Sequence, residues 1–489
     1  MKRAAALPSR STYLAIGLLA AALGGLLLCM TRLLEGKWLV ATLIGIFLPW
    51  LALATKDVER FLLGTFVFLI PINASAYLRY EPVTSGANGI NLSVCDIALF
   101  GLYVLWAAKL LGQRPEQRRI HLFPTISIPF GLLMLWSGFS ITQSITPIFS
   151  WYEWIRLLKT GFAFWYLANN IDREAHLLTI AGSLCLSVCG QGIVAVAQHF
   201  LGTTFGLKTL GETENSLLFH QMGSVQIMRV GGTLGHPNSL AFFLVTILPI
   251  VLVLLLAYER WWIRLLALFT FMVGCAGLIL TFSRGAWLSF SLMTPVIVWL
   301  LAWKHRGWWH AVTRLAGFAF FITLVLVPFA SSIAHRLFEY DYGRAWSRVP
   351  LMQVACNMIM AHPILGVGLN NYTLVMDRYD NTLEHITRYV AQPVHNLFLL
   401  VAAEVGLPGL AFFLWLLAVL LRRAWHGFWQ RDGVFGAWCL ALLGSLSSYL
   451  LHGLVDFKYL GSNYSFALLM GLAAALGARP SAAMGNDAQ

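Results

Sequence analysis

Residues 395–421 read HNLFLLVAAEVGLPGLAFFLWLLAVLL, and this stretch decides the fold. After His395, it holds a single acidic or basic side chain, Glu404, in a run long enough to cross a bilayer as a helix. A polar segment, residues 331–394, comes directly before it and contains five arginines and five acidic residues. We therefore expect the chain to re-enter a membrane at His395. An ionisable group at such a boundary is a site hypothesis.

The composition of the whole chain supports a membrane protein. Hydrophobic residues make up 58% of the 489 residues and charged residues 11%, whereas a soluble domain has roughly 25% charged residues. The net charge of +12 does not indicate nucleic-acid binding, because the basic residues are scattered over short loops. The seven cysteines lie mostly in apolar runs and show neither zinc spacing nor a disulfide framework.

Apolar runs along the chain predict an all-α, polytopic protein with about fourteen transmembrane helices. The range is twelve to fourteen if two pairs of runs, within 38–78 and 262–303, are re-entrant or tilted. The first run follows the basic sequence MKRAAALPSR and is expected to be retained as a span. The predicted spans are 12–31, 38–55, 61–78, 93–111, 124–142, 151–168, 176–200, 238–257, 262–281, 285–303, 312–330, 395–421, 433–453 and 462–477.

The distribution of basic residues predicts the orientation of these spans. Short loops rich in Lys and Arg alternate with longer, irregular segments, and basic loops favour the cytoplasm. The long segments then all face one compartment, away from the cytoplasm. We expect four regions: N-terminal transmembrane helices (1–330), a large non-cytoplasmic loop (331–394), C-terminal transmembrane helices (395–477) and a disordered cytoplasmic tail (478–489).

Two short sequences on the non-cytoplasmic side carry arginines. MRVGGTLGHPNSLAFFL (228–244) joins a glycine-rich turn to a helix that Asn238 or Ser239 is expected to cap, with Arg229 nearby. LTFSRGAWLSF (280–290) places Arg284 between two apolar runs. Arg284 could be a snorkelling residue at a helix end. Alternatively, the two arginines form a clamp for phosphate, because the planar guanidinium donates two hydrogen bonds to a phosphoryl group.

A third arginine, Arg348, stands at the head of a helix-like run, residues 350–360. Met352, Ala355 and Met358 share one apolar face at helical spacing. We expect this helix to lie on the membrane surface or to pack into it. Its methionines are explained by ordinary packing, although a face that adapts to lipid is the alternative.

His395 is the candidate acid/base group, because an imidazole titrates near neutral pH and its neutral form can take a proton from a hydroxyl. The alternative is that His395 caps its helix together with Asn396. His452 and Asp456, one helical turn apart, could meet each other or a substrate. No HxxxH, HExxH or DxD spacing supports a metal site. A transfer enzyme that works without metal would need arginines to neutralise a pyrophosphate leaving group.

Four segments in this order carry a family resemblance: RVGGTLGHPNSLA, FSRGAW, SRVPLMQVACNMIMAHPILGVGLNNY and VHNLFLLVAAEVGLPGL. Together they resemble the signature segments of the O-antigen ligase/O-antigen polymerase superfamily. The matching blocks lie within about residues 229–410. The family usually has Asn-Pro-Asn where this chain has His236-Pro237-Asn238, which leaves the turn intact and puts a role for the first Asn in doubt.

The resemblance implies a Gram-negative inner-membrane enzyme similar to the GT-C class of glycosyltransferases. Such enzymes take glycan from undecaprenyl pyrophosphate on the periplasmic side and need neither ATP nor a cofactor. On this chain, Arg229 and Arg284 would hold the donor pyrophosphate, and His395 would activate the acceptor hydroxyl, with inversion at the anomeric carbon. Further candidate substrate-binding residues are Arg348, Arg388, Asn396, His236, Asn238, His452 and Asp456.

Members of the superfamily differ in the acceptor that receives the glycan. A ligase passes the glycan to lipid A-core, a polymerase passes it to another carrier-linked unit, and a relative passes it to protein. A single dominant large loop favours the ligase, and the short tail argues against the protein-modifying relatives. A transporter of lipid-linked glycan is the alternative from another class. It is disfavoured because the chain shows no clear internal repeat and its ionisable residues gather at one face.

Overall fold

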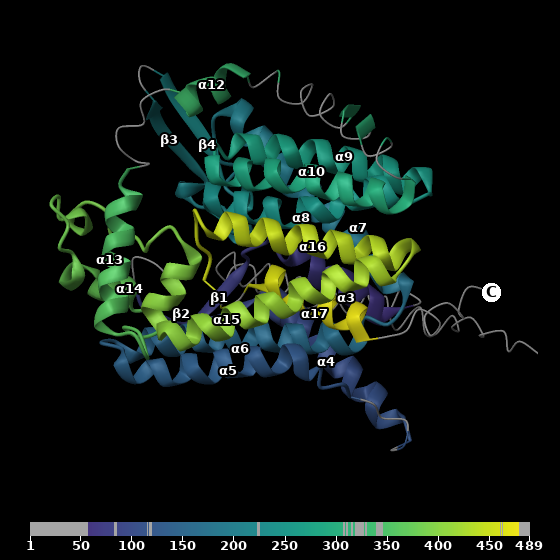
Figure 1. Cartoon of the computed structure of the whole chain (residues 1–489), viewed down its shortest axis with the longest axis horizontal. Coiled ribbons are helices and arrows are strands. Elements are labelled where there is room, and N and C mark those ends of the chain that lie inside the picture. The colour runs from purple at the N-terminus through teal and green to yellow at the C-terminus, as the bar shows by residue number, and fades with distance from the viewer. Residues whose placement is uncertain are drawn as a thin grey trace, which may run out of the picture. The chain divides into compact units, whose positions relative to one another are not determined.

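We describe the fold from a computed structural model of the chain, shown in Figure 1. The residues described are 57–82, 86–114, 116, 120–222, 225–306, 309, 312–313, 316–317, 327, 330–338, 346–459, 461 and 463–478. Three predicted features lie wholly or largely outside them: the spans at 12–31 and 38–55 and the C-terminal tail. The predicted span at 312–330 also lies almost entirely outside the described residues.

Helices dominate this part of the chain, which confirms the expected all-α polytopic class. Eight described helices are long and apolar enough to cross a membrane. They extend over α4 (Val94–Gly112), α5 with η2 (Pro124–Gln143), α7 (Glu174–Leu201), α8 (Pro237–Ala257), α9 (Trp261–Leu280), α10 (Arg284–Arg306), α15 (Leu397–Gln430) and α16 (Gly433–Gly453). The remaining longer helices are α3 (Val58–Leu69), α6 (Pro147–Asn170) and α17 (Tyr464–Ala478).

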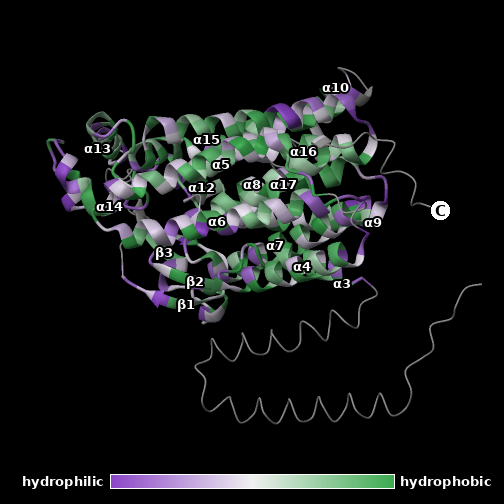
Figure 2. Cartoon of the chain, turned by 90° about the horizontal axis from the view of Figure 1, so that it is seen from below, coloured by the Kyte–Doolittle hydropathy of each residue, from purple (hydrophilic) through white to green (hydrophobic). Residues whose placement is uncertain are grey.

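The centre of the helix packing is α8. Its sequence, PNSLAFFLVTILPIVLVLLLA, is apolar on every side, as expected of a helix that is enclosed by other helices. It packs against α16 and α9 and also contacts α7 and α10. Helix α6 packs against α17, and α15 packs against α5 and α16. Figure 2 shows hydrophobic residues along most of these helices, which suits a chain surrounded by lipid.

Two antiparallel hairpins interrupt the helices. Strands β1 (Ser75–Tyr80) and β2 (Gly89–Ser93) pair from Ser75 opposite Ser93 to Tyr80 opposite Gly89. Strands β3 (Leu217–Met222) and β4 (Val225–Val230) pair from Leu217 opposite Val230 to Met222 opposite Val225. The chain then passes through η5 (Gly232–Leu234) into α8. The second hairpin therefore delivers Arg229, in β4, to the start of the central helix.

The predicted span at 61–78 is wrong in extent. Helix α3 ends at Leu69, and the same apolar run continues as strand β1 from Ser75. Pro71 separates them, because proline lacks the amide hydrogen that a continuing helix needs. A 12-residue helix rises about 18 Å, which is less than the thickness of the hydrocarbon core.

The polar segment before α15 is ordered where the structure describes it. It contains α12 (Ala330–Phe338), α13 (Arg348–Ala361), α14 (Tyr372–Val375) and the short turns η7 (Met376–Tyr379) and η8 (Ile386–Arg388). The helix predicted at 350–360 is confirmed. Ala355 and Met358 on its predicted apolar face are buried, and Met352 is partly buried. Its core is shared with α15, so α13 packs onto the helical part of the protein.

Helix α15 is broken at Gly406, whose φ of 76° and ψ of 174° are not helical. The carbonyls freed by the break accept hydrogen bonds from outside the helix: Ala403 from Val367 N at 2.9 Å, Glu404 from Gly368 N at 3.0 Å, and Val405 from Trp136 Nε1 at 3.1 Å. Unpaired backbone groups are costly at membrane depth, so the break exists because the polar segment and α5 supply these partners.

Candidate active site

A cavity of about 510 Å³ opens where several of these elements meet. Its wall includes the start of α8, the residues just before α15, the segment that follows α16, helix α6 and the β1–β2 hairpin. The wall contains six side chains that can bind an ion or transfer a proton or hydrogen bond: Arg156, His236, Asn238, His395, Asp456 and Lys458.

His395 lies in this wall just before α15, and the neighbouring Asn396 caps that helix. The Oδ1 of Asn396 accepts from Phe398 N at 3.0 Å and Leu399 N at 2.9 Å, while its Nδ2 donates to Leu454 O at 3.0 Å. The capping function that was an alternative for His395 therefore falls to Asn396. His395 remains outside the helix with its ring in the cavity wall.

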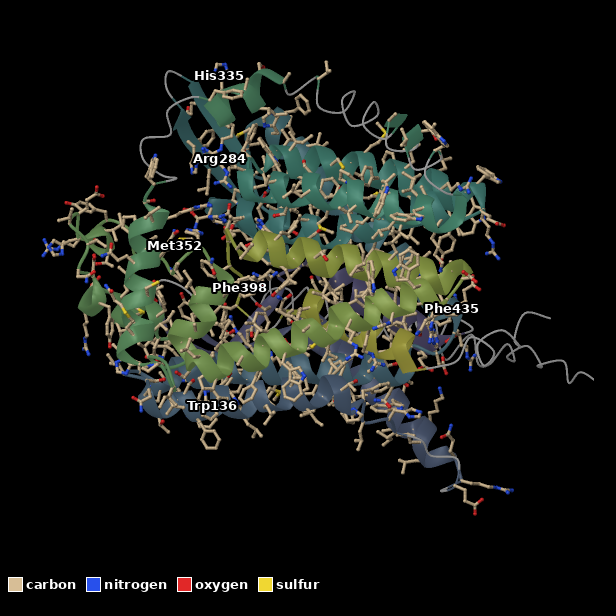
Figure 3. All side chains as sticks on the ribbon, in the orientation of Figure 1. Trp136, Arg284, His335, Met352, Phe398 and Phe435 are labelled. Atoms are coloured by element: carbon tan, nitrogen blue, oxygen red, sulfur yellow. The ribbon has the colours of Figure 1, made fainter. Side chains whose placement is uncertain are left out.

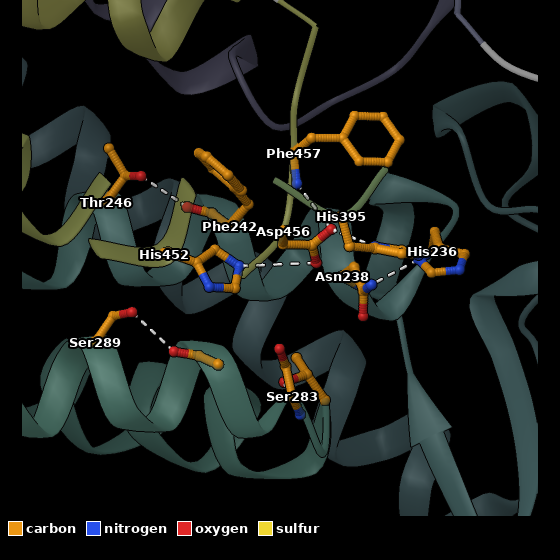
Figure 4. Close-up of polar contacts among 12 residues, drawn as sticks. His236, Asn238, Phe242, Thr246, Ser283, Ser289, His395, His452, Asp456 and Phe457 are labelled. Carbon is orange, nitrogen blue, oxygen red and sulfur yellow. Dashed lines mark hydrogen bonds and ion pairs between the residues drawn. The ribbon is translucent and has the colours of Figure 1, made fainter. Parts of the chain in front are cut away.

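The imidazole of His395 pairs with Asp456, as Figure 4 shows. The Nδ1 of His395 lies 3.1 Å from Oδ1 of Asp456. Asp456 is 4% exposed, and burial alone would raise the pKa of its carboxyl. The hydrogen bond from His395 and the charges of His452 and His395 outweigh burial, so the pKa lies below the ordinary value.

An ionised Asp456 accepts hydrogen bonds only, so Nδ1 of His395 carries the proton. In the neutral ring, Nε2 is then the basic nitrogen. No described residue makes a hydrogen bond to that nitrogen. The pair therefore has the arrangement of a general base whose orientation and tautomer are fixed by a carboxylate.

His452 lies behind Asp456 and does not line the cavity. It is fully buried in α16, with Nε2 4.0 Å from Oδ2 of Asp456, too far for a hydrogen bond. Its ring packs on Phe242 of α8 at a centroid distance of 4.9 Å. The two residues thus meet each other, and only Asp456 faces the cavity.

Arg229 joins β4 to two other elements. Its Nε donates to Thr281 O at 2.7 Å, and its Nη2 donates to Oδ1 of Asn238 at 2.6 Å. The side chain is 6% exposed. Burial lowers the pKa of the guanidinium to about 9, with further lowering by the positive charges of Arg336, Arg348 and Arg284, while Asp456 raises it. Four arginines from four elements therefore gather near one carboxylate; we call them the arginine cluster.

Arg284 is the first residue of α10, and the turn before it is held by two members of the arginine cluster. Phe282 in this turn has a φ of 48°, a left-handed conformation unusual for a residue with a side chain. Arg229 bonds the carbonyl of Thr281, and the Nε of Arg336 bonds that of Phe282 at 3.1 Å. Figure 3 shows Arg284 at the same end of the helices as His335 of α12.

Gly285 brings this turn close to Asp456. A Cβ at residue 285 would collide with Val455, and the ring of His452 lies just beyond. The start of α10 therefore packs directly on the segment that contains Asp456. This close approach explains how charges in the arginine cluster act on the carboxylate that orients His395.

Arg336 is a member of the cluster that sequence reasoning missed. It was counted only among the charges of the polar segment, although it is 7% exposed. The available signal was its position in ASSIAHRLF, where apolar residues flank it at helical spacing and favour burial of that face. Its contact with a carbonyl 54 residues away could not be read from the sequence.

The other predicted residues are placed differently. Arg348 begins α13, is half-buried and contributes its charge to the cluster. Arg388, in η8, is exposed and does not line the cavity. Asn238 lines the cavity and is held by Arg229.

The predicted cap of α8 is wrong. His236 caps the helix, not Asn238 or Ser239, because Pro237 occupies the first helical position, where its missing amide hydrogen costs nothing. The Nδ1 of His236 accepts from Asn238 N at 3.1 Å. Burial lowers the pKa of this imidazole to about 4, helped by the charge of Arg229, so the ring is neutral near pH 7. The histidine thus supplies the acceptor that an asparagine would supply at the same turn.

Among the residues that the structure describes, no group of three or more His, Cys, Asp and Glu side chains could hold a metal ion. The charged groups around the cavity are instead cations and one His–Asp pair. Such a site can bind anions and move a proton.

The fold and site define a multi-pass helical membrane protein with a basic, polar cavity where its helices meet the polar segment. Residues 269–414 match the family model described as O-Antigen ligase, which confirms the resemblance to that family. The matched range includes Arg284, Arg336, Arg348 and His395, while Asp456 lies outside it. No curated protein matches the chain. The family indicates a glycosyltransferase-like enzyme that acts on lipid-linked glycans in a bilayer.

Proposed function

We propose that this protein is an O-antigen ligase that transfers glycan from undecaprenyl pyrophosphate to a hydroxyl of lipid A-core, at the periplasmic face of the inner membrane. The observation that carries the proposal is the pairing of His395 with a buried, ionised Asp456 next to the arginine cluster. A base and a concentration of positive charge are what transfer from a pyrophosphate carrier requires.

The base in the proposed reaction is Nε2 of His395. It takes the proton from the acceptor hydroxyl as that oxygen forms a bond to the anomeric carbon of the donor glycan. The bond from the anomeric carbon to the pyrophosphate oxygen breaks with its electron pair, so the carrier leaves as undecaprenyl pyrophosphate. Attack opposite to the leaving group inverts the anomeric centre. Asp456 stabilises the imidazolium that forms.

The arginine cluster stabilises the negative charge that develops on the leaving pyrophosphate. Arg284 and Arg348 are assigned to direct binding of the phosphates, because guanidinium groups donate paired hydrogen bonds and stay charged. Arg229 and Arg336 each bond a carbonyl of the turn before Arg284, so they position Arg284 and add positive charge. The donor pyrophosphate bond supplies the driving force, and the proposal includes neither ATP nor a metal ion.

The test is transfer by purified, full-length protein in liposomes that contain undecaprenyl-pyrophosphate-linked glycan and lipid A-core. Wild-type protein is expected to form glycan-lipid A, with or without EDTA. Longer carrier-linked glycan beside unmodified lipid A-core would instead identify a polymerase. Glycan moved across the bilayer without a new glycosidic bond would identify a transporter.

Removing the base should abolish transfer while donor binding persists. His395→Ala is expected to lose about 10²–10⁴-fold in rate, the usual contribution of a general base. Asp456→Asn should lose about tenfold or more, because an amide does not hold the same tautomer or stabilise the imidazolium. Rates are measured in the liposome assay and donor binding by equilibrium dialysis in detergent. Normal turnover in the His395 variant would remove this residue from the chemistry.

A further inference from the structure

Two cations, Arg156 and Lys458, line the cavity, whereas the four members of the arginine cluster are not among its lining residues. Arg156 comes from α6, and Lys458 follows Asp456 in the segment between α16 and α17. The arginine cluster comes from β4, α10, α12 and α13 instead. The two groups of positive charge therefore reach the same region of the protein from different elements.

Arg156 and Lys458 lack the hydrogen bonds and ion pairs with described residues that other partly buried cations make. The Nε of Arg156 is buried without a hydrogen-bond partner. The Nζ of Lys458 makes no ion pair or hydrogen bond with a described residue, and burial lowers the pKa of this ammonium to about 8. By contrast, Lys159, one turn along α6, pairs with Asp96 at 2.8 Å. Partly buried cations that lack protein partners point to an external anion.

The neighbouring carboxyl of Glu153 feels the charge of Arg156 but makes no ion pair with either cation. Glu153, on the same helix as Arg156, uses Oε1 to accept from Gly461 N at 2.9 Å, and its Oε2 has no hydrogen-bond partner. No ion pair links Glu153 to either cation among the described residues. Glu153, Glu404 and Lys458 also line a small internal cavity, so Lys458 stands between two buried carboxyls and the main cavity.

The wall around the two cations suits a sugar. Asn88, Asn91 and Tyr77 of the β1–β2 region line the same cavity, and the Oδ1 of Asn91 is buried without a partner. Amide groups exchange hydrogen bonds with hydroxyls, and an aromatic ring packs against the apolar face of a pyranose. An anionic group carried on a sugar fits this combination better than a free inorganic ion.

We propose that Arg156 and Lys458 form an acceptor subsite, which holds a phosphate or carboxylate group of the acceptor glycan while His395 activates its hydroxyl. The inference rests on the proposed function. The arginine cluster is already assigned to the donor pyrophosphate, so the second pair of cations belongs to the other substrate. The subsite selects acceptors by charge and leaves the chemistry to His395.

The test compares acceptors that differ only in charge, in the full-length protein in liposomes. One acceptor carries its anionic core groups, and the other has had its phosphates removed enzymatically and its carboxylates methylated. Arg156→Gln and Lys458→Gln should each raise the KM for the anionic acceptor by about ten- to a hundredfold, the usual effect of losing one charge-assisted hydrogen bond. The KM for the donor should stay constant.

The control variant is Lys109→Gln, an exposed lysine of α4 outside the cavity. It should keep the wild-type preference for the anionic acceptor, whereas the two subsite variants should treat both acceptors alike. Arg156→Lys should recover part of the preference for the anionic acceptor. This recovery would show that the fold tolerates a change at residue 156. A rise in the KM for the donor, or an equal rise for both acceptors, would overturn the subsite.

A binding experiment separates this inference from the proposed reaction. Lipid-free core oligosaccharide, with and without its anionic groups, is titrated into detergent-solubilised His395→Ala protein, which does not turn over. Tighter binding of the anionic form that disappears with Lys458→Gln supports the subsite, even if the wild type makes no glycan-lipid A. Equal binding of both forms contradicts the subsite, even if transfer is observed.

Discussion

His395 and Asn396 are adjacent residues with separate functions. Asn396 satisfies the first amides of α15 and bonds the end of α16, so the backbone at this corner is fixed without any contribution from the histidine ring. The ring is therefore free to pair with Asp456, 61 residues further along the chain. The carboxylate determines which ring nitrogen faces the cavity as a base.

Arg284 should not tolerate replacement by lysine. Arg284→Ala is expected to lose about 10²–10³-fold in transfer rate, as when one preorganised donor to a developing anion is removed. Arg284→Lys keeps the charge but loses the paired hydrogen bonds, so it should still lose about tenfold or more. Steady-state rates at varied donor concentration measure both. Arg173→Lys, at an exposed arginine, is the matched control. Full activity of the Arg284→Lys protein would mean that Arg284 contributes only its positive charge.

At the scale of single residues, the sequence pointed to most of the charged side chains that the fold brings together, but not to their geometry. Arg229, Arg284, Arg348 and His395 stand out because charged residues are rare beside apolar runs. Arg336 was missed because its role depends on a carbonyl in a distant turn. Similarly, no local pattern shows that Lys458 lacks a partner, since that depends on which side chains the fold brings around it.

At the scale of elements, the long helix α15 depends on the polar segment that precedes it. The break at Gly406 frees carbonyls, and Val367, Gly368 and Trp136 bond them. The backbone of residue 364 packs so closely on Gly406 that a side chain has no room there. The first part of α15, which follows directly from His395, is thus tied to the segment that carries Arg348.

Gly406→Ala should destabilise the protein. The backbone conformation of Gly406 is almost restricted to glycine and costs another residue about 1–3 kcal/mol, and a Cβ would also collide with the carbonyl of Ile364. We expect a clearly lower midpoint of thermal unfolding in detergent. Gly182→Ala is the control, because a Cβ there meets no atom within 4 Å and alanine favours a helix. Equal midpoints for both variants would mean that the break is not a required feature.

Long apolar helices and the short helix α13 were predictable, whereas the two hairpins were not. The spans predicted between 93 and 303 and between 395 and 477 coincide with α4 to α10 and α15 to α17, because runs of about twenty apolar residues have few alternatives. The run at 61–78 was misassigned because residues 70–78, after the end of α3, contain no charged side chain and so extend the uncharged run. The β3–β4 hairpin was not predicted either. Hairpins depend on cross-strand pairing, which a scan for apolar runs does not test.

At the scale of the whole described region, the helices of the polar segment and the β3–β4 hairpin lie toward one end of the long helices. Figures 1 and 2 both show α13, α14 and this hairpin there. The arginine cluster comes largely from these elements and from helix ends. The orientation predicted from the basic loops would place that end on the periplasmic side.

Cys356 provides a direct test of this orientation. It is an exposed cysteine in α13, on the proposed periplasmic side. Cys29 lies outside the described residues and is first replaced by alanine. In spheroplasts that carry this Cys29→Ala protein, a membrane-impermeant maleimide should label Cys356, and the additional change Cys356→Ser should abolish the label. A cysteine introduced by Glu259→Cys, at the exposed turn between α8 and α9, should react only after the membrane is permeabilised. The reverse pattern would invert the predicted topology.

The arginine cluster also has a consequence for the resting protein. The positive charges of Arg336, Arg348 and Arg284 act on the buried Arg229. Their repulsion lowers the stability of the folded protein when no substrate is bound. An anion that enters the cluster removes part of this opposition, and any ligand that binds only the folded state stabilises it. In the proposed function this anion is the donor pyrophosphate. The folded state would then be most stable with the donor bound and least stable once the carrier has left.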